Sequence, residues 1–242
     1  MGDLSEMLGG LISYALLAAL ATALLVAAVT DLRRREIDNW LNAGIALAAP
    51  LYWLAAGFDW VAVLFQLGLM LITFLLAFAL YAARQMGGGD VKLLTALALW
   101  FPPGSFVQLI VIMGVVGGAA SVAMGVFNMR RSPQEALRNG LATFAASVWV
   151  MGTCAVGFAA ATGRPLITPD ATATMAAVLP GGMMLAVLAA MLAGALMVGM
   201  GHIFRRQRGA IPIPYGVAIS AAALWVLLQN QVFPPLSGAV LG

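Results

Sequence analysis

The sequence predicts an all-α, polytopic integral membrane protein, and three observations support this fold class. Hydrophobic residues make up 63% of the 242 residues and charged residues only 9%, whereas a soluble domain carries about a quarter charged residues. Apolar runs with the length of a spanning helix recur along the chain. Basic residues gather in alternate connections between these runs. Because no polar region is long enough to fold alone, we expect one membrane-embedded domain over residues 1–242.

About eight transmembrane helices are expected, one for each apolar run. The runs cover residues 8–30, 40–57, 60–83, 91–101, 105–127, 141–162, 176–204 and 215–228. The fourth run is too short to cross a bilayer alone. Irregular backbone is tolerated at membrane depth only where protein or a cavity surrounds it, so a sunken or re-entrant helix is expected there. Residues 130–176 contain an extra loop and span to which the sequence assigns no role.

The basic residues predict the orientation of the chain in the membrane. With the acidic N-terminus outside, only Arg164 of the twelve Lys and Arg residues falls at the outer face. The other eleven fall in cytoplasmic loops, as the positive-inside rule requires: Arg33, Arg34, Arg35, Arg84, Lys92, Arg130, Arg131, Arg138, Arg205, Arg206 and Arg208. The net charge of +3 is thereby assigned to the membrane surface, so no nucleic-acid partner is expected.

Two aspartates abut apolar helices at this cytoplasmic edge. Asp31 ends the first run, and Asp90 follows three glycines and begins the fourth. A carboxylate close to hydrocarbon costs several kcal/mol unless it is paired, solvated or protonated, so such a residue suggests a functional site. Each feature also has a simpler interpretation. Asp31 could be a solvated interfacial residue, and the glycines with Asp90 could be a helix break with a cap.

A pair of carboxylates a few ångström apart supports the chemistry of an aspartic protease. Such a pair shares a proton, so one member can take a proton from water while the other polarises a peptide carbonyl. This chemistry needs no metal or other cofactor, and none is expected. Glycines beside the pair leave room for an extended substrate backbone. Two other functions stay open: a proton-coupled transporter or channel that uses the same aspartates, and a non-catalytic assembly subunit of a pilus or secretion system.

Three ordered segments resemble the type IV prepilin peptidases, a family of GxGD membrane aspartic proteases. Residues 87–94, GGGDVKLL, resemble that family's GxGD motif. Residues 31–39, DLRRREIDN, are similar to its first aspartate block, D-x-R-x-x-x-I-P-N, with Asp38 in place of the usual proline. Residues 213–219, IPYGVAI, resemble the element that often opens its last helix.

The resemblance implies that Asp31 and Asp90 are catalytic and that the leader peptides of type IV prepilins are cleaved at the cytoplasmic face of the bacterial inner membrane. The prepilin and the lipid bilayer are the implied partners, and the oligomeric state is not predicted. The chain has no cysteine-bearing cytoplasmic insertion, and in this it resembles the short, peptidase-only members of the family that accompany tight-adherence (Flp) pili. Further residues of the motifs are expected to shape the active site or bind substrate: Gly87, Gly88, Gly89, Lys92, Pro214, Tyr215 and Gly216.

Overall fold

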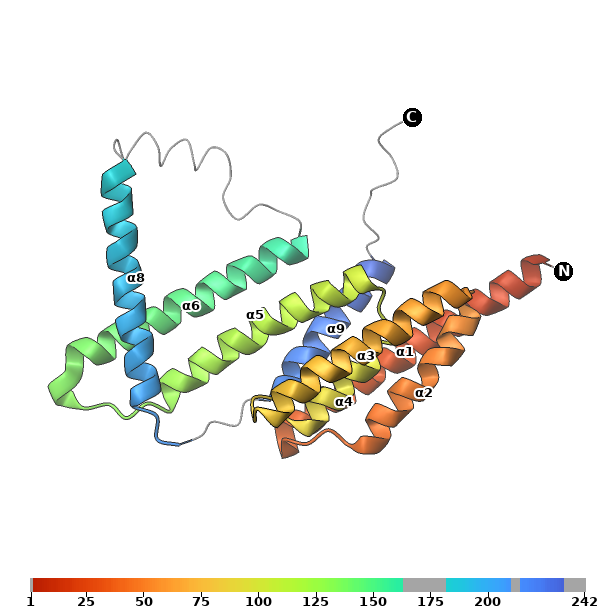
Figure 1. Cartoon of the computed structure of the whole chain (residues 1–242), viewed down its shortest axis with the longest axis horizontal. Coiled ribbons are helices and arrows are strands. Elements are labelled where there is room, and N and C mark those ends of the chain that lie inside the picture. Colours follow the sequence, from red (N-terminus) through yellow and green to blue (C-terminus); the bar gives the residue numbers. More distant parts are fainter. Residues whose placement is uncertain (1, 163–181, 210–213, 233–242) are drawn as a thin grey trace. The chain divides into compact units, whose positions relative to one another are not determined.

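The computed structural model describes residues 2–162, 182–209 and 214–232 (Figure 1). Within these ranges the chain forms eight α-helices and a short 3-10 turn, η1. The helices are α1 (Gly2–Arg34), α2 (Asn39–Ala55), α3 (Trp60–Ala82), α4 (Gly88–Leu97), α5 (Pro103–Phe127), α6 (Ala136–Thr162), α8 (Gly182–Arg205) and α9 (Tyr215–Val232), and η1 is Pro133–Glu135. The all-α class is confirmed. The predicted start of the seventh run and the loop with Arg164 lie outside the described residues.

Five of the described helices are long and apolar enough to cross a membrane. They cover Met7–Arg34, Trp60–Ala82, Pro103–Phe127, Pro133–Ala159 and Val187–Arg205, and Tyr215–Asn230 is a shorter apolar helix. Many large apolar side chains on these helices are exposed, including Leu64, Met151 and Met197. A chain with this surface has to be covered by lipid. The protein is therefore a polytopic membrane protein.

The chain divides into two compact units, residues 1–113 with 214–242, and residues 114–213. The first unit contains both predicted catalytic aspartates. Each unit is compact by itself. The expectation of one membrane-embedded domain over residues 1–242 therefore stays a prediction.

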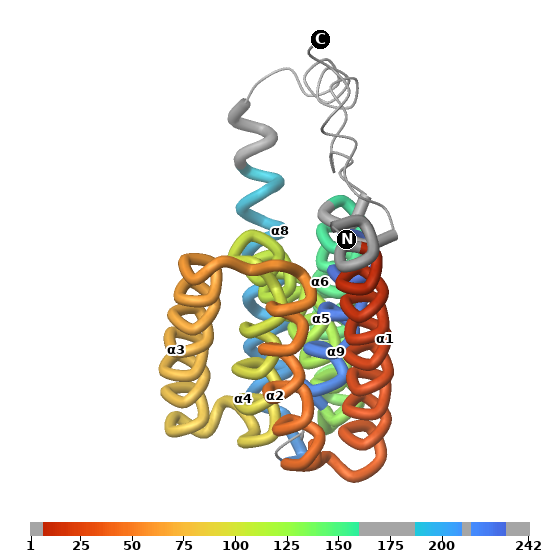
Figure 2. The backbone as a smooth tube through the Cα atoms, turned by 90° about the vertical axis from the view of Figure 1, so that its right-hand side faces the viewer, coloured from red at the N-terminus to blue at the C-terminus, as the bar shows by residue number. Residues whose placement is uncertain are grey.

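In the first unit, α4 is the central helix, with α2, α3 and α9 packed against it (Figure 2). Most of its residues are buried, including Val91, Leu93 and Leu97. Helix α1 packs in turn against α2 and α9. The ten residues of α4 rise only about 15 Å at the helical repeat, half the thickness of a bilayer core. Its stability must therefore come from the longer helices around it.

The backbone that follows α4 is buried, and side chains of neighbouring helices satisfy its carbonyl groups. Gln66 Nε2 donates to the carbonyls of Ala98 and Phe101 at 3.0 and 2.7 Å. Trp53 Nε1 donates to the Leu99 carbonyl at 2.8 Å. A free carbonyl in hydrocarbon costs several kcal/mol, so these donors allow the helix to end inside the protein. Gln66, a polar residue in a largely apolar helix, thus has a structural role.

In the second unit, α6 and α8 pack closely, and η1 lies against α6. A Cβ at Gly199 would lie 2.6 Å from the Cβ of Ala145, so only glycine permits this approach of the two helices. Beyond α5 and α8, Met129 and Gln207 form an isolated antiparallel bridge. The N–H of Arg130 donates to the Arg206 carbonyl at 2.8 Å, which joins the two connections.

Candidate active site

Asp31 and Asp90 line the same polar cavity of about 370 Å³ in the first unit. Asp31 lies in the last turn of α1 and is 6% exposed, while Asp90 lies in the first turn of α4 and is 8% exposed. The remaining walls come from two short segments, residues 35–39 and residues 87–89. The structure thus places two carboxyl groups that are 59 positions apart in the sequence at one cavity.

A left-handed residue, Arg35, follows the last turn of α1, four positions after Asp31. The N–H of Arg35 donates to the Asp31 carbonyl at 2.9 Å, and Arg35 has a φ of 59°. This conformation is uncommon for a residue with a side chain. It turns the chain so that Ile37 becomes buried beside the cavity. The second half of the first aspartate block, residues 35–39, therefore lines the same cavity as Asp31.

The N-terminus of α9 holds the Asp31 carboxylate. The N–H of Val217 donates to Asp31 Oδ2 at 3.2 Å, across 186 residues of sequence. The first N–H groups of a helix lack helical partners and carry the positive end of its dipole, so this position favours a negative charge. Gly216 has no room for a side chain, because a Cβ there would lie 2.8 Å from Asp31 Oδ2. Residues 215–217 thus act on the first aspartate, which gives the third sequence motif a physical role.

The glycine segment differs from its predicted form, because α4 begins at Gly88 and not at Val91. Gly87 is the N-cap with a φ of −73°, a value open to any residue. Space is what selects glycine at this position, since a Cβ on Gly87 would lie 2.9 Å from Asp90 Oδ2. A Cβ on Gly89 would lie 3.3 Å from the Cβ of Ile37. The glycines therefore bring the first turn of α4 close to the aspartate block.

Burial and the neighbouring charge both act on Asp90. Burial first, and then the negative charge of Asp31, raise the pKa of Asp90 to about 6, although a hydrogen bond from the Gly87 N–H opposes them. Asp90 lies in the first turn of α4, ahead of the apolar run of residues 91–101. Between the ordinary carboxyl pKa of about 4 and a pH of about 6, this carboxyl group holds its proton while ordinary carboxyl groups are ionised.

The other predicted site residues occupy different positions around the aspartates. Lys92 lies outside the cavity wall and donates from Nζ to Asn39 Oδ1 at 2.7 Å. The Pro214 carbonyl accepts from the Val217 N–H at 3.3 Å, and Tyr215 is the first residue of α9. Asp38 lines the cavity and occupies the N-cap position of α2, where its side chain makes no capping hydrogen bond.

Two residues near the aspartates were not predicted as site residues from the sequence. Ile37 packs between Gly89 and Gly216 and so joins the aspartate block to α4 and α9. Asn42 is 4% exposed and donates from Nδ2 to the Gly89 carbonyl at 3.5 Å, while its Oδ1 is buried without a partner among the described residues. An amide in the first turn of an apolar helix is the signal that could have identified Asn42.

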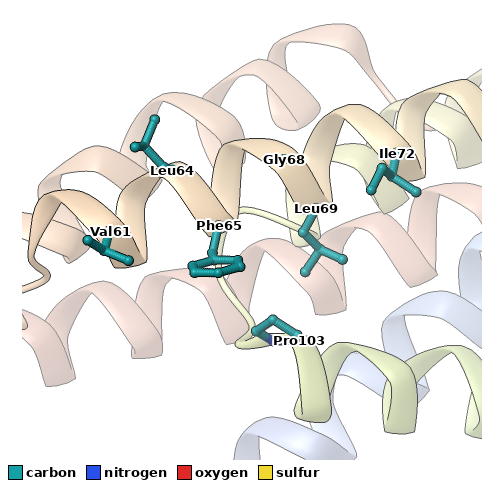
Figure 3. Close-up of a pocket in the computed structure, with 7 residues that line it drawn as sticks. All are labelled: Val61, Leu64, Phe65, Gly68, Leu69, Ile72 and Pro103. Carbon is teal, nitrogen blue, oxygen red and sulfur yellow. The ribbon is translucent and has the colours of Figure 1, made fainter.

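A second cavity of the first unit, of about 470 Å³, has only apolar walls and offers no catalytic group. Phe65 and Leu69 of α3 extend toward Pro103 in this cavity (Figure 3). In the described residues no group of three His, Cys, Asp or Glu side chains could hold a metal ion. The cavity with the two aspartates is therefore the candidate active site of the first unit.

Two buried aspartates that line one polar cavity are the arrangement that an aspartic protease uses, here in a multi-pass helical protein. Comparison with known families agrees, because residues 18–122 match the Type IV leader peptidase family, a family of aspartic-type proteases. This part of the chain is a domain of that family, and it includes both aspartates. The family implies prepilin leader peptidase activity, with prepilins as substrates. No curated protein and no solved structure shows a significant match to the chain.

Proposed function

We propose that the protein is an endopeptidase that cleaves the leader peptide of type IV prepilins, with Asp31 and Asp90 as the catalytic dyad. One observation carries the proposal: the two buried carboxyl groups line a single polar cavity, one wall of which consists of three consecutive glycines. Peptide hydrolysis by such a pair needs neither a metal ion nor a covalent nucleophile.

The surroundings of the two aspartates assign them different roles. Asp31 accepts the Val217 N–H and lies at the positive end of α9, so it is the member that carries the negative charge. Asp90 is buried beside that charge and its pKa is raised to about 6, so it is the member that holds the shared proton. Their titration is coupled, and the apparent pKa values belong to the pair.

Hydrolysis then follows from these two protonation states. Asp31 accepts a proton from a water molecule as the water oxygen attacks the peptide carbonyl carbon. Asp90 donates a hydrogen bond to the carbonyl oxygen and stabilises the charge that develops there. When the tetrahedral intermediate collapses, the carbon–nitrogen bond breaks and the leaving nitrogen receives the proton that Asp31 took up. Asp31 is ionised again at the end of the cycle.

Gly87, Gly88 and Gly89 supply the wall along which the substrate backbone passes. The cavity of about 370 Å³ lies within the range of small-ligand sites, so it accommodates a few extended residues around the cleaved bond. A side chain on Gly87 would enter the space beside Asp90, and a side chain on Gly89 would meet Ile37. Lys92 and Tyr215 flank the site and contribute to binding of the prepilin segment.

The active site faces the cytoplasm in this proposal, and the N-terminus lies outside. The support is the positive-inside pattern of the sequence, since Arg33, Arg34 and Arg84 end helices at the edge where the aspartates lie. Helices α2, α4 and α9 complete the eight-span topology, with α4 as the short, re-entrant element. The bacterial inner membrane is the corresponding location.

A cleavage assay on a purified prepilin tests the dyad. Asp31→Asn and Asp90→Asn keep the size of the side chain and remove its charge, so each variant should lose more than about 1000-fold in the rate of leader cleavage. Asp59→Asn is the matched control. Asp59 is an exposed N-cap residue that accepts the Ala62 N–H at 2.7 Å, and asparagine caps a helix equally well.

Normal cleavage by Asp90→Asn would refute the proposal. The same assay separates the alternatives, because a transporter or an assembly subunit would leave the prepilin uncut even with both aspartates present. Accumulation of each variant in the membrane, measured by immunoblot, excludes loss of the protein as the cause of lost activity.

A further inference from the structure

A second polar cavity lies in the unit formed by residues 114–213, which contains neither aspartate of the proposed dyad. Its volume is about 530 Å³, and its walls come from η1, the start of α6 and the last turns of α8. Three arginines, Arg138, Arg205 and Arg206, line it together with His202 and one carboxylate, Glu135.

The charges of this cavity do not balance. Glu135 receives both ion pairs found in the described residues, from Arg206 at 2.5 Å and from Arg138 at 3.7 Å. No carboxylate of the described residues lies within ion-pair distance of Arg205, which is exposed at the end of α8. Three guanidinium groups around one carboxylate leave a net positive charge in the cavity. Arginine binds phosphate well, because its planar group donates two parallel hydrogen bonds.

Hydrogen bonds hold the walls of the cavity in place. Asn139 Nδ2 donates to the Ser132 carbonyl at 2.9 Å, so its Oδ1 accepts from His202 Nε2 at 3.0 Å. The Arg206 carbonyl accepts the Arg130 N–H, which ties the end of α8 to the connection after α5. A site with fixed walls loses little entropy when it binds a ligand.

The other wall of the cavity is apolar and lies toward the membrane interior. Met197 and Val198 line it and are 76% and 53% exposed. Met197 and Arg205 are eight residues apart on α8, about 12 Å along the helix axis. Gly201 lies between them on the same face, and a Cβ there would have no neighbour within 4 Å. Met197, Gly201 and Arg205 thus form a row on one face of α8. The row has an apolar side chain at one end, an open space at Gly201 and a charged side chain at the other end.

We propose that this cavity binds the phosphate headgroup of an anionic phospholipid, with an acyl chain lying along Met197 and Val198. The membrane spans of α6 and α8 have their ends here, at Pro133 and Arg205, so the cavity lies at the depth of the headgroups. Basic pockets between the ends of membrane helices are typical sites for such headgroups. A free phosphate ion would use the arginines and leave the apolar wall without a function.

Lipid titration of the purified full-length protein in dodecylmaltoside micelles tests this site. Phosphatidylglycerol should raise the unfolding temperature in a saturable way, while phosphatidylcholine and inorganic phosphate at the same concentrations should not. Arg138→Gln combined with Arg205→Gln should weaken the apparent affinity for phosphatidylglycerol by about tenfold or more. The matched control is Arg130→Gln with Arg131→Gln, which removes equal charge from exposed side chains outside the cavity. This control should change the affinity less than about threefold.

A filled cavity provides a second test that leaves every charge in place. Gly201→Leu places a side chain in the hollow and should weaken phosphatidylglycerol binding by about tenfold. Gly194→Leu, at another open position of α8, should leave binding unchanged. Equal loss in both arginine pairs, equal stabilisation by inorganic phosphate, or full binding by Gly201→Leu would each overturn the proposal. The readout is lipid binding, so its outcome is independent of leader cleavage.

Discussion

Replacing Gly216 with alanine tests whether the start of α9 positions the first aspartate. The new Cβ would lie 2.8 Å from Asp31 Oδ2 and 2.7 Å from Ile37 Cδ1. Ordinary contact begins at 3.4 Å, so the carboxylate oxygen has to move by roughly 0.6 Å, and the Val217 hydrogen bond of 3.2 Å is disturbed. Catalytic groups tolerate about 0.5 Å of displacement, and 1 Å costs about 100-fold.

We therefore expect Gly216→Ala to lower kcat for leader cleavage by about 10- to 100-fold, equivalent to roughly 1.4–2.7 kcal/mol of barrier. The assay is cleavage of a purified prepilin, with Gly44→Ala as the control. Gly44 is an exposed helical glycine with no atom within 4 Å of a built Cβ, so that variant should keep full activity.

The second contact of the new methyl group can be separated from the first. Ile37→Val removes Cδ1, so the Gly216→Ala, Ile37→Val double variant relieves only the clash with the isoleucine. Activity of the double variant should stay low. Full activity in either Gly216→Ala or the double variant would refute the argument that this glycine positions Asp31.

Three further predictions concern the acid of the dyad and the support of α4. Because the active form needs a protonated Asp90, kcat/KM should fall as the pH rises through about 6, and a flat profile up to pH 8 would contradict the assigned roles. A raised folded-state pKa means that ionised Asp90 destabilises the fold. Asp90→Asn should therefore match the wild type in stability near pH 4 and exceed it by up to roughly 3 kcal/mol above pH 6, measured by thermal unfolding at both pH values. Gln66→Leu should destabilise the protein by about 2–4 kcal/mol in the same measurement, because two buried carbonyls lose their donor. An unchanged unfolding temperature would show that water or another donor replaces Gln66.

Much of the candidate site could be predicted from the sequence because its signals are local. Asp31 and Asp90 each interrupt an apolar pattern, and that contrast does not depend on the fold. The start of α4 at Gly88 could not be predicted from the sequence in the same way. Glycine disfavours helix in isolation, yet Gly88 and Gly89 are helical because buried packing against α2, α3 and α9 outweighs the propensity.

The role of the glycines was predicted in part. The sequence indicates that space is needed beside Asp90, and the structure identifies what occupies it. At Gly87 the neighbour is the carboxylate of Asp90, at Gly89 it is Ile37, and at Gly216 it is Asp31. Asp90 is close to Gly87 in the sequence, but Ile37 and Asp31 lie in segments far from Gly89 and Gly216, so no local pattern could reveal these two neighbours.

By itself the sequence determined the class of the protein, the order of its helices and the two acidic residues of the candidate site. Hydrophobicity, charge and helix length are properties of short stretches, so they can be read without the fold. The tertiary structure decided which aspartate has which surroundings, because Val217 reaches Asp31 across 186 residues. It also decided how a ten-residue helix ends inside the protein, since Trp53 and Gln66 come from helices that only packing places beside it. Hydrogen bonds and burial between distant segments exist only once the helices have packed.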